Sequence, residues 1–117
     1  MCGITFYYTK DRAYEIELLN SLRSTSHRGP DSSDSYFINV EDAFVGLGHN
    51  RLSIIDLSPK GSQPMMKGQL RIVFNGELYN YKSLRNELLD LGHAFDTDTD
   101  TEVILTAFVE YGIDSFG

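Results

Sequence analysis

The chain has 117 residues, 41% of them hydrophobic and 12% aromatic, which suffices for one domain with a single core. The formal net charge of -7 and the scattered Lys and Arg residues argue against a nucleic-acid partner, because phosphates would be repelled. No stretch approaches the roughly 20 consecutive apolar residues of a membrane span, and the N-terminus lacks the layout of a secretory signal. We therefore expect a cytoplasmic protein with no membrane partner.

A strand and a helix are predicted at the start of the chain. Residues 2–8 are β-branched and aromatic, which indicates a buried strand that starts within a residue or two of the N-terminus. The next segment has apolar residues at helical spacing until a polar stretch at 24–26 ends the pattern. The predicted apolar face consists of Ile16, Leu19 and Leu22, with Leu18 beside them.

Extended segments are predicted in the middle of the chain. Residues 36–40 and 43–49 read as two short strands, and Glu41-Asp42 between them predicts a hairpin. The apolar run 52–57 predicts a further extended segment. After a loop rich in Pro and Gly, residues 70–74 predict a compact strand that ends at an Asn-Gly dipeptide.

Two helices are predicted in the last third. Asn80 is a favourable N-cap and Gly92 a favourable C-cap for the first of them. Its apolar face is Leu84, Leu88 and Leu91. Thr99 and Glu102 have the spacing of a capping box for the second helix. Its apolar face is Ile104, Ala107, Phe108 and Tyr111, before Gly112. With no internal repeat or linker, these elements predict one α+β unit.

Cys2 is the only cysteine, so it is either a small buried apolar residue or a reactive group. Removal of Met1 would give one residue both a thiol and a free α-amino group. Amino groups of this kind titrate near roughly pH 8, so this one could take the thiol proton and return it to a leaving amine. Gly3 leaves room for backbone to approach a substrate. An ordinary buried cysteine near a terminus is the alternative.

A second candidate is Asn75-Gly76-Glu77, which follows a predicted strand. In this layout a side-chain amide and a backbone N–H can point at one developing oxyanion. Because Asn-Gly is also the commonest tight-turn dipeptide, a plain turn between strand and helix is the competing interpretation.

Asp96, Asp98 and Asp100 alternate with Thr, as acidic residues do at the start of a calcium-binding loop. The calcium interpretation fails, because Thr101 and Ala107 stand where the loop needs Gly and a bidentate Glu. The remaining alternatives are a solvated acidic loop, favourable charge at a helix N-terminus, and a carboxylate that binds a substrate ammonium group.

Arg51 is either a surface cation or a fork for a substrate carboxylate. His27, His49 and His93 lie in separate segments without metal-ligand spacing, which favours structural roles for all three. There is no Gly-rich phosphate loop in the sequence. We therefore expect neither a metal site nor a nucleotide site in this chain.

The sequence resembles the glutamine amidotransferase domains of class II, in particular those of the asparagine synthetase B type. The resemblance runs from Met1 to about Tyr111 and rests on separated motifs in a fixed order. These are Met1-Cys2-Gly3-Ile4, His27-Arg28-Gly29-Pro30-Asp31, Arg51-Leu52-Ser53-Ile54-Ile55-Asp56, Gly61 with Gln63-Pro64, Asn75-Gly76-Glu77-Leu78-Tyr79-Asn80, and Asp100-Thr101-Glu102-Val103-Ile104-Leu105.

The resemblance implies a role for each matched residue. Cys2 would be the nucleophile, and Asn75 with the Gly76 N–H would form the oxyanion hole. Arg51 would bind the glutamine α-carboxylate. The residues implied for the pocket wall are Leu52, Ser53, Ile54 and Ile55, and those implied for the α-amino end are Glu77 and Asp100.

The family fold is an N-terminal-nucleophile sandwich of four layers, α-β-β-α, with antiparallel sheets. Members of the family continue with further strands and most add a synthetase domain, so we expect residues 1–117 to be the N-terminal portion of the glutaminase domain, truncated, with the synthetase domain absent. The glutaminase step is expected to need no metal and no organic cofactor. ATP and Mg would serve only the synthetase domain.

The implied activity is hydrolysis of glutamine to glutamate and ammonia through a cysteine γ-glutamyl thioester, with the ammonia supplied to ATP-dependent synthesis of asparagine from aspartate. One alternative is the same chemistry for a different acceptor, a sugar or another carboxylate. The other is a non-catalytic regulatory module of the same fold, which a retained Met1 would favour because it removes the base.

Overall fold

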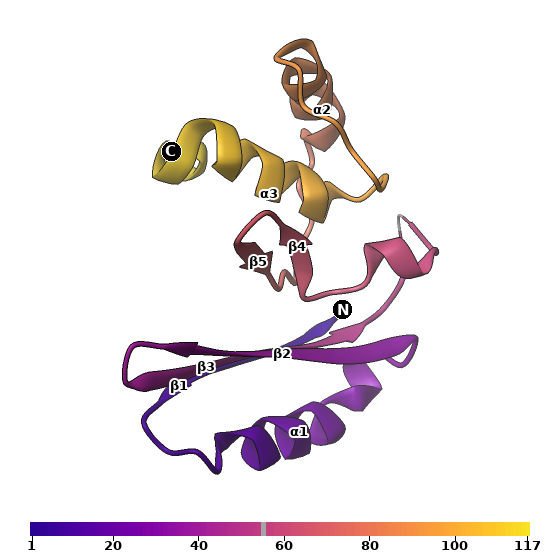
Figure 1. The fold of residues 1–117 in the computed structure, drawn as a ribbon. Helices are drawn as coiled ribbons and strands as arrows, with labels where there is room; N and C mark the ends of the chain where they lie inside the picture. Colours follow the sequence, from indigo (N-terminus) through magenta and orange to yellow (C-terminus); the bar gives the residue numbers. More distant parts are fainter. Residues whose placement is uncertain (55) are drawn as a thin grey trace.

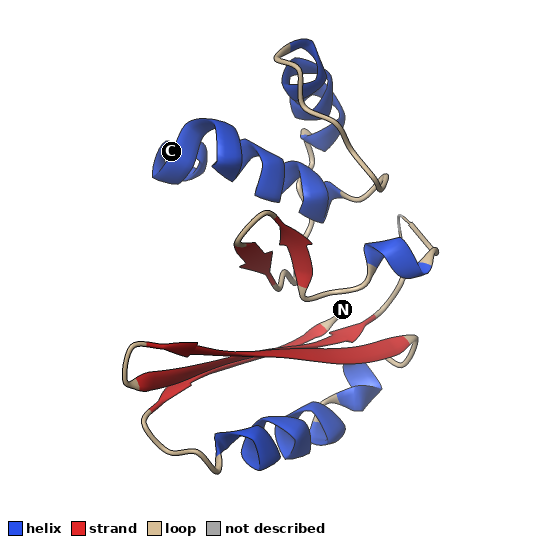
Figure 2. Cartoon of the chain, in the orientation of Figure 1, coloured by secondary structure: helices blue, strands red, loops and turns tan. Residues whose placement is uncertain are grey.

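The computed structural model describes residues 1–54 and 56–117 (Figures 1 and 2). The elements are β1 (Gly3–Thr9), α1 (Tyr14–Ser24), β2 (Ser32–Val40), β3 (Ala43–Arg51), β4 (Met65–Lys67), β5 (Leu70–Ile72), α2 (Tyr81–Asp90) and α3 (Asp100–Tyr111). Short 3-10 turns lie at Ser26–Arg28, Pro59–Gly61 and Gly112–Phe116. No helix in the described ranges is long and apolar enough to cross a membrane.

The elements are stacked on one another (Figure 1). Helix α1 covers one face of an antiparallel sheet with the strand order β1-β3-β2. The antiparallel hairpin β4–β5 lies on the other side of that sheet, and α3 lies beyond the hairpin. The predicted α+β class with antiparallel sheets is confirmed.

Helix α1 packs through Tyr14, Leu18 and Leu22, which are spaced four residues apart. The sheet admits them because β3 has glycines beneath the two leucines. A Cβ on Gly46 would lie 2.6 Å from Leu18 Cδ1, and one on Gly48 would lie 2.8 Å from Leu22 Cδ2. The glycines thus let the helix approach the central strand closely.

The predicted face of this helix is wrong in part. Ile16 is 66% exposed and Leu19 is also exposed, whereas Leu18, predicted only to flank the face, is fully buried. Residues three and four apart both keep helical spacing, so the pattern fits two neighbouring stripes, and only the sheet selects one.

The N-terminal strand is also less buried than predicted. It begins at Gly3, one residue after Cys2, and Ile4, Phe6 and Tyr8 are exposed. These three side chains lie opposite His49, Leu47 and Val45 in the register with β3, on the sheet face away from α1.

The predicted hairpin is confirmed, and both of its strands are longer than expected. Strand β2 begins at Ser32 and strand β3 ends at Arg51, and Glu41 in the turn between them has a φ of 55°. The extra residues matter because they carry Arg51 to the end of the central strand.

Two predictions in the middle of the chain are wrong. Residues 52–54 and 56–57 form no strand, and Leu57 is 76% exposed; position 55 lies outside the described residues. The strand predicted at 70–74 ends at Ile72, and its partner β4 was not predicted. Periodicity cannot detect strands this short.

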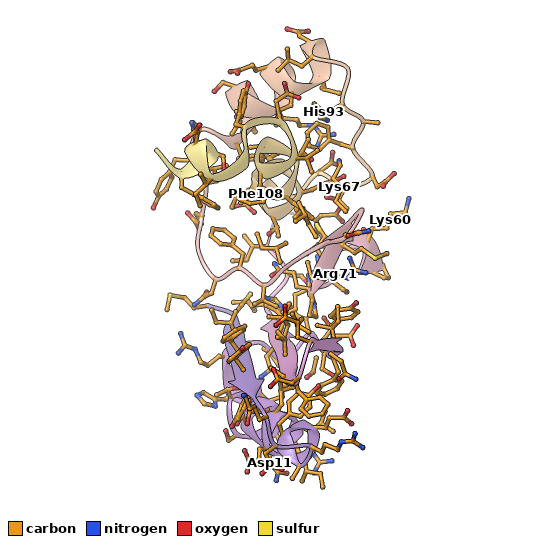
Figure 3. The ribbon with its side chains drawn as sticks, turned by 60° about the vertical axis from the view of Figure 1, so that its left-hand side comes forward. Asp11, Lys60, Lys67, Arg71, His93 and Phe108 are labelled. Atoms are coloured by element: carbon orange, nitrogen blue, oxygen red, sulfur yellow. The ribbon has the colours of Figure 1, made fainter. Side chains whose placement is uncertain are left out.

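The hairpin contacts both neighbouring layers. The Arg71 guanidinium carbon lies 4.7 Å from the centre of the Tyr36 ring of β2, and Figure 3 shows Arg71 on the side of the hairpin that faces the first sheet. Lys67 Nζ donates to the Ala94 carbonyl (2.9 Å) and lies 5.0 Å from the centre of the Phe95 ring, so it bridges the hairpin and the segment before α3.

The last two helices share a small core. Leu88, Val103 and Ala107 are buried in it, with Leu78, Tyr81, Leu84 and Phe95 packed against them. Leu91 and Tyr111, both predicted for apolar faces, are exposed. Leu91 follows the last residue of α2, and Tyr111 is the last residue of α3, where its hydroxyl donates to the Glu87 carboxylate of α2.

The predicted caps are confirmed in part. Gly92 ends α2 with a φ of 96°, a conformation that favours glycine. Asn80 is the N-cap residue of α2, as predicted, but its side chain makes no capping hydrogen bond. At α3, Thr99 Oγ1 accepts from the Glu102 N–H (3.2 Å), which is one half of the predicted capping box. The other half is not formed, because the Glu102 carboxylate accepts from the N–H groups of Asp96 (2.9 Å) and Thr97 (2.7 Å) and not from that of Thr99. Burial alone would raise the pKa of Glu102, but these hydrogen bonds lower it.

Candidate active site

A cavity of about 390 Å³ lies where the N-terminus, the end of β3 and the segments before α2 and α3 meet. The N-terminus lies between the first sheet and the hairpin (Figure 1). The residues predicted for the site that line the cavity are Cys2, Arg51, Leu52, Ile54, Asn75, Gly76, Glu77 and Asp100. They come from segments far apart in the sequence, and the fold brings them together.

Two predicted residues are not part of this set. Ser53 lies outside the cavity lining in the ranges that the structure describes, and its N–H donates to Asp31 Oδ2 (2.7 Å). Ile55 lies outside the described residues.

Cys2 is held at the edge of the first sheet. Gly3 pairs with Asn50 of β3, which anchors the chain directly after the thiol. The Leu52 N–H donates to Cys2 Sγ (3.2 Å), and the Leu52 carbonyl lies 3.7 Å from the same sulfur. Cys2 is half-buried and its thiol forms no disulfide. Strand β1, which starts at the next residue, gives the thiol the defined position that its proposed chemistry requires.

Arg51 is buried, with 7% of its surface exposed, so the surface-cation alternative is excluded. Its Nη1 donates to the Ser58 carbonyl (2.7 Å), and its Nη2 donates to the Asp56 carbonyl. A Cβ on Gly61 would lie 2.2 Å from Nη2, so any larger residue there would have to displace the guanidinium. Backbone carbonyls therefore hold the guanidinium, and its other N–H groups are available to a ligand.

The loop 27–31 packs against the backbone at the end of β3. Gly29 approaches the β3 backbone so closely that a Cβ would lie 2.1 Å from the Asn50 carbonyl oxygen. The Asp31 N–H donates to the Arg51 carbonyl (3.0 Å), so this loop supports the strand end that carries Arg51.

Asp56 connects two parts of the site. Its carboxylate accepts from the Ser58 N–H (2.8 Å) and from the Asp98 N–H (3.3 Å). Hydrogen bonds from Ser58, above all, lower the pKa of Asp56, so it is ionised at neutral pH. The segment that holds Arg51 is thus tied to the segment that leads into α3.

Asp100 is the first residue of α3 and is only 6% exposed. Its Oδ2 accepts from the Leu78 N–H (3.0 Å), and it lines the cavity, so the solvated-loop alternative is excluded for this residue. Asp98, in contrast, is exposed, and its carboxylate lies 3.7 Å from Arg85 Nη2. Among the described residues, no three His, Cys, Asp or Glu side chains are grouped to hold a metal ion.

Asn75 and Gly76 follow β5 and both line the cavity. The backbone of Phe74, the residue before them, is hydrogen-bonded to the side chains of His49 and Gln63. These two lining residues were missed: His49 was interpreted as structural, and Gln63 was noted only for the resemblance. The available signal was the position of His49 two residues before Arg51, which puts both side chains on the same face of a strand.

Residues 1–116 match the family model of a glutamine amidotransferase domain, and the chain belongs to that family. Asparagine synthetase [glutamine-hydrolyzing] 1 of Bacillus subtilis is 43% identical to it over 118 residues, 95% of this chain and 18% of the relative. A putative asparagine synthetase [glutamine-hydrolyzing] 2 of Methanocaldococcus jannaschii is 35% identical, over 97% of this chain and 25% of the relative. The amidase chry2 of Gibberella zeae is 37% identical, over 97% of this chain and 18% of the relative.

The family resemblance stated from the sequence motifs is therefore confirmed. The chain spans only 18% to 25% of the length of these curated relatives.

Proposed function

We propose that this chain supplies the glutaminase half-reaction of a longer protein, in which it forms the N-terminal portion of the amidotransferase domain. The observation that carries the proposal is the cavity itself, whose wall combines a thiol, an Asn-Gly pair and charged residues of opposite sign. Glutamine has an amide for the first two and a carboxylate and an ammonium group for the charges. The stacking of α1, the first sheet, the hairpin and α3 supports the four-layer α-β-β-α sandwich as the complete fold (Figure 1).

In the proposed reaction, Cys2 Sγ attacks the side-chain amide carbon of glutamine and its proton passes to the α-amino group freed by removal of Met1. The carbonyl oxygen becomes an oxyanion, stabilised by the Asn75 side-chain amide and the Gly76 N–H. Transfer of the proton to the leaving nitrogen releases ammonia and leaves the γ-glutamyl thioester, which water then hydrolyses to glutamate. Neither a metal nor an organic cofactor takes part in this sequence.

The two charged ends of glutamine determine its orientation in the cavity. Arg51 takes the α-carboxylate with the N–H groups that Asp56 and Ser58 do not use. Glu77 and Asp100 take the α-ammonium group at the other end, and Leu52 and Ile54 cover the apolar part of the substrate. The charges therefore present the side-chain amide to Cys2.

We propose asparagine synthesis as the use of the ammonia, because glutamine-hydrolysing asparagine synthetases recur among the relatives. The acceptor would be bound by a synthetase domain outside these 117 residues, with ATP and Mg. We place the protein in the cytoplasm, where a nucleophilic thiol stays reduced.

The test uses the Cys2→Ala variant of the full-length protein. Glutamine hydrolysis should be abolished, while synthesis from free ammonia should persist, because only thioester formation needs the thiol. Cys2→Ser should also be severely impaired, since a hydroxyl is far harder to deprotonate than a thiol. Near wild-type hydrolysis in either variant would refute the nucleophile, and an intact-mass measurement that finds Met1 retained in active protein would refute the proposed base.

A further inference from the structure

The two peptide groups on either side of Phe74, the residue before Asn75, are each held by a buried side chain. The Phe74 N–H donates to Gln63 Oε1 (2.6 Å), and the Phe74 carbonyl accepts from His49 Nε2 (3.3 Å). Gln63 is 8% exposed and His49 is 1% exposed, so water competes little for either hydrogen bond. The bonded carbonyl is part of the planar peptide unit that contains the Asn75 nitrogen, so fixing it fixes the start of Asn75.

The sheet does not provide this constraint. Strand β5 ends at Ile72, two residues before Phe74, so the backbone at Phe74 has left the β4–β5 ladder. Phe74 is half-buried, so its backbone groups are partly shielded from water and need hydrogen-bond partners; here two side chains take the place of a neighbouring strand.

Each of the two side chains is connected to a segment that carries a charged end of the proposed substrate site. Gln63 Nε2 donates to Thr101 Oγ1 (3.1 Å), and Thr101 follows Asp100 in the first turn of α3. His49 lies two residues before Arg51 in β3. The Phe74 peptide is therefore placed relative to both Arg51 and Asp100.

The hydrogen bond to a carbonyl requires a proton on His49 Nε2, so the neutral ring has its lone pair on Nδ1. Nδ1 is buried and has no hydrogen-bond partner within the described part of the chain. Burial, more than the nearby Arg51 charge, lowers the pKa of His49. The ring thus remains a neutral donor to Phe74.

We propose that His49 and Gln63 are positioning residues that orient the backbone on both sides of Phe74 and thereby aim the oxyanion donors of Asn75 and Gly76. This inference rests on the proposed function and adds to it a cause for the placement of the donors. A displacement of about 1 Å in such a group costs on the order of a hundredfold in rate, so the loss of either side chain should be measurable.

The test compares Gln63→Met with Gln63→Glu in the full-length protein. Methionine keeps the shape but makes neither hydrogen bond, whereas glutamate keeps the acceptor for the Phe74 N–H. We expect kcat for glutamine hydrolysis to fall roughly tenfold to a hundredfold in Gln63→Met, with KM within about twofold, and to recover for the most part in Gln63→Glu. His49→Leu should behave like the methionine variant, and Gln69→Met, at an exposed glutamine of the hairpin turn, is the matched control.

A change in KM alone, or an unchanged kcat, would overturn the inference. Should Gln63→Met lose stability as well, the same substitution in an Asn75→Ala background decides: a positioning residue has little left to position there, so its effect on kcat should shrink, and full additivity would overturn the inference. The Cys2→Ala variant distinguishes a failure of the positioning role from a failure of the proposed function. If it abolishes hydrolysis while Gln63→Met is normal, only the positioning role fails; if it does not, the proposed function fails.

Discussion

The Leu52 N–H lies 3.2 Å from Cys2 Sγ, so the residue after Arg51 also holds the sulfur of the proposed nucleophile. The cation proposed to bind the substrate and the thiol are thereby positioned by one short stretch of backbone at the end of β3. Arg51 is held in turn by the Asp56 and Ser58 carbonyls, so a change in the loop 56–61 should affect substrate binding without touching the thiol.

Asn75→Ala should lower the rate of thioester formation much more than it weakens glutamine binding, because an oxyanion donor acts mainly on the transition state. Removal of one such donor typically costs about 3 kcal/mol, or roughly a hundredfold or more in rate. Steady-state and single-turnover kinetics of the full-length protein measure both quantities, with Asn86→Ala on the exposed side of α2 as the control. An increase in KM with intact turnover would make Asn75 a ground-state contact or a turn residue.

Arg51→Ala and Asp100→Ala should each weaken glutamine binding about thirty-fold or more, which corresponds to the roughly 2–3 kcal/mol of a charge-assisted contact in a desolvated site. Calorimetric titration of glutamine into full-length Cys2→Ala protein measures the affinity without turnover. Asp90→Ala, at the exposed end of α2, is the control for the loss of one carboxylate.

The alternative for Asp100 is a purely structural role at the N-terminus of α3. That role predicts a loss of stability nearer 0.5 kcal/mol and unaltered glutamine affinity. Because Asp100 also accepts from the Leu78 N–H, Asp100→Asn helps to separate the two roles: asparagine keeps an acceptor for Leu78 but lacks the charge. Normal affinity in both variants would leave Arg51 to be assessed by itself.

Gly61→Ala should weaken glutamine binding while the thiol remains reactive. The added Cβ would lie 2.2 Å from Arg51 Nη2, so the guanidinium has to move away from its two carbonyl partners. Overpacking of this kind costs about 1–3 kcal/mol, and we expect about a tenfold loss of affinity. Titration of Cys2 with a thiol reagent should give the wild-type rate, and Ser62→Ala should bind glutamine normally. Unchanged affinity in Gly61→Ala would show that the cation tolerates displacement.

His49 should make the folded state less stable in mild acid. Its pKa is lowered in the folded protein, chiefly by burial, whereas in the unfolded chain it titrates near about 6.5. Below that pH the unfolded state binds a proton that the folded state does not, so the free energy of unfolding falls as pH falls, by at most about 1.4 kcal/mol per unit. The charged groups that share the cavity with His49 are Arg51, Asp56, Glu77 and Asp100.

Urea denaturation between pH 7.5 and 5.5, that is, about one unit on either side of the ordinary histidine pKa, measures this effect. His49→Gln should flatten the dependence, while His93→Gln serves as the comparison because His93 lies outside the cavity, with its Nε2 2.6 Å from Glu110 Oε2. The same pH dependence in wild type and His49→Gln would contradict the assignment of a neutral, buried ring.

The sequence by itself determined what local chemistry controls. Thr99 caps α3, Gly92 ends α2 and Glu41-Asp42 turns between two paired strands, because capping and turn geometry depend on a few adjacent residues. The separated motifs also identified a set of residues that the fold does bring to one cavity. Their individual catalytic and binding roles stay predictions.

Only the tertiary structure decided which of several locally equivalent options is used. The spacing in α1 fits two stripes, and the glycines of β3 select the one with Leu18. For Arg51 the sequence is equally compatible with a surface cation and a fork for a substrate carboxylate, and only the fold buries it among the Asp56 and Ser58 carbonyls and Gly61. His49 and Gln63 meet at Phe74 from segments 25 and 11 residues away. Hydrogen bonds between segments so far apart depend on how the layers stack, and no periodicity within either segment encodes them.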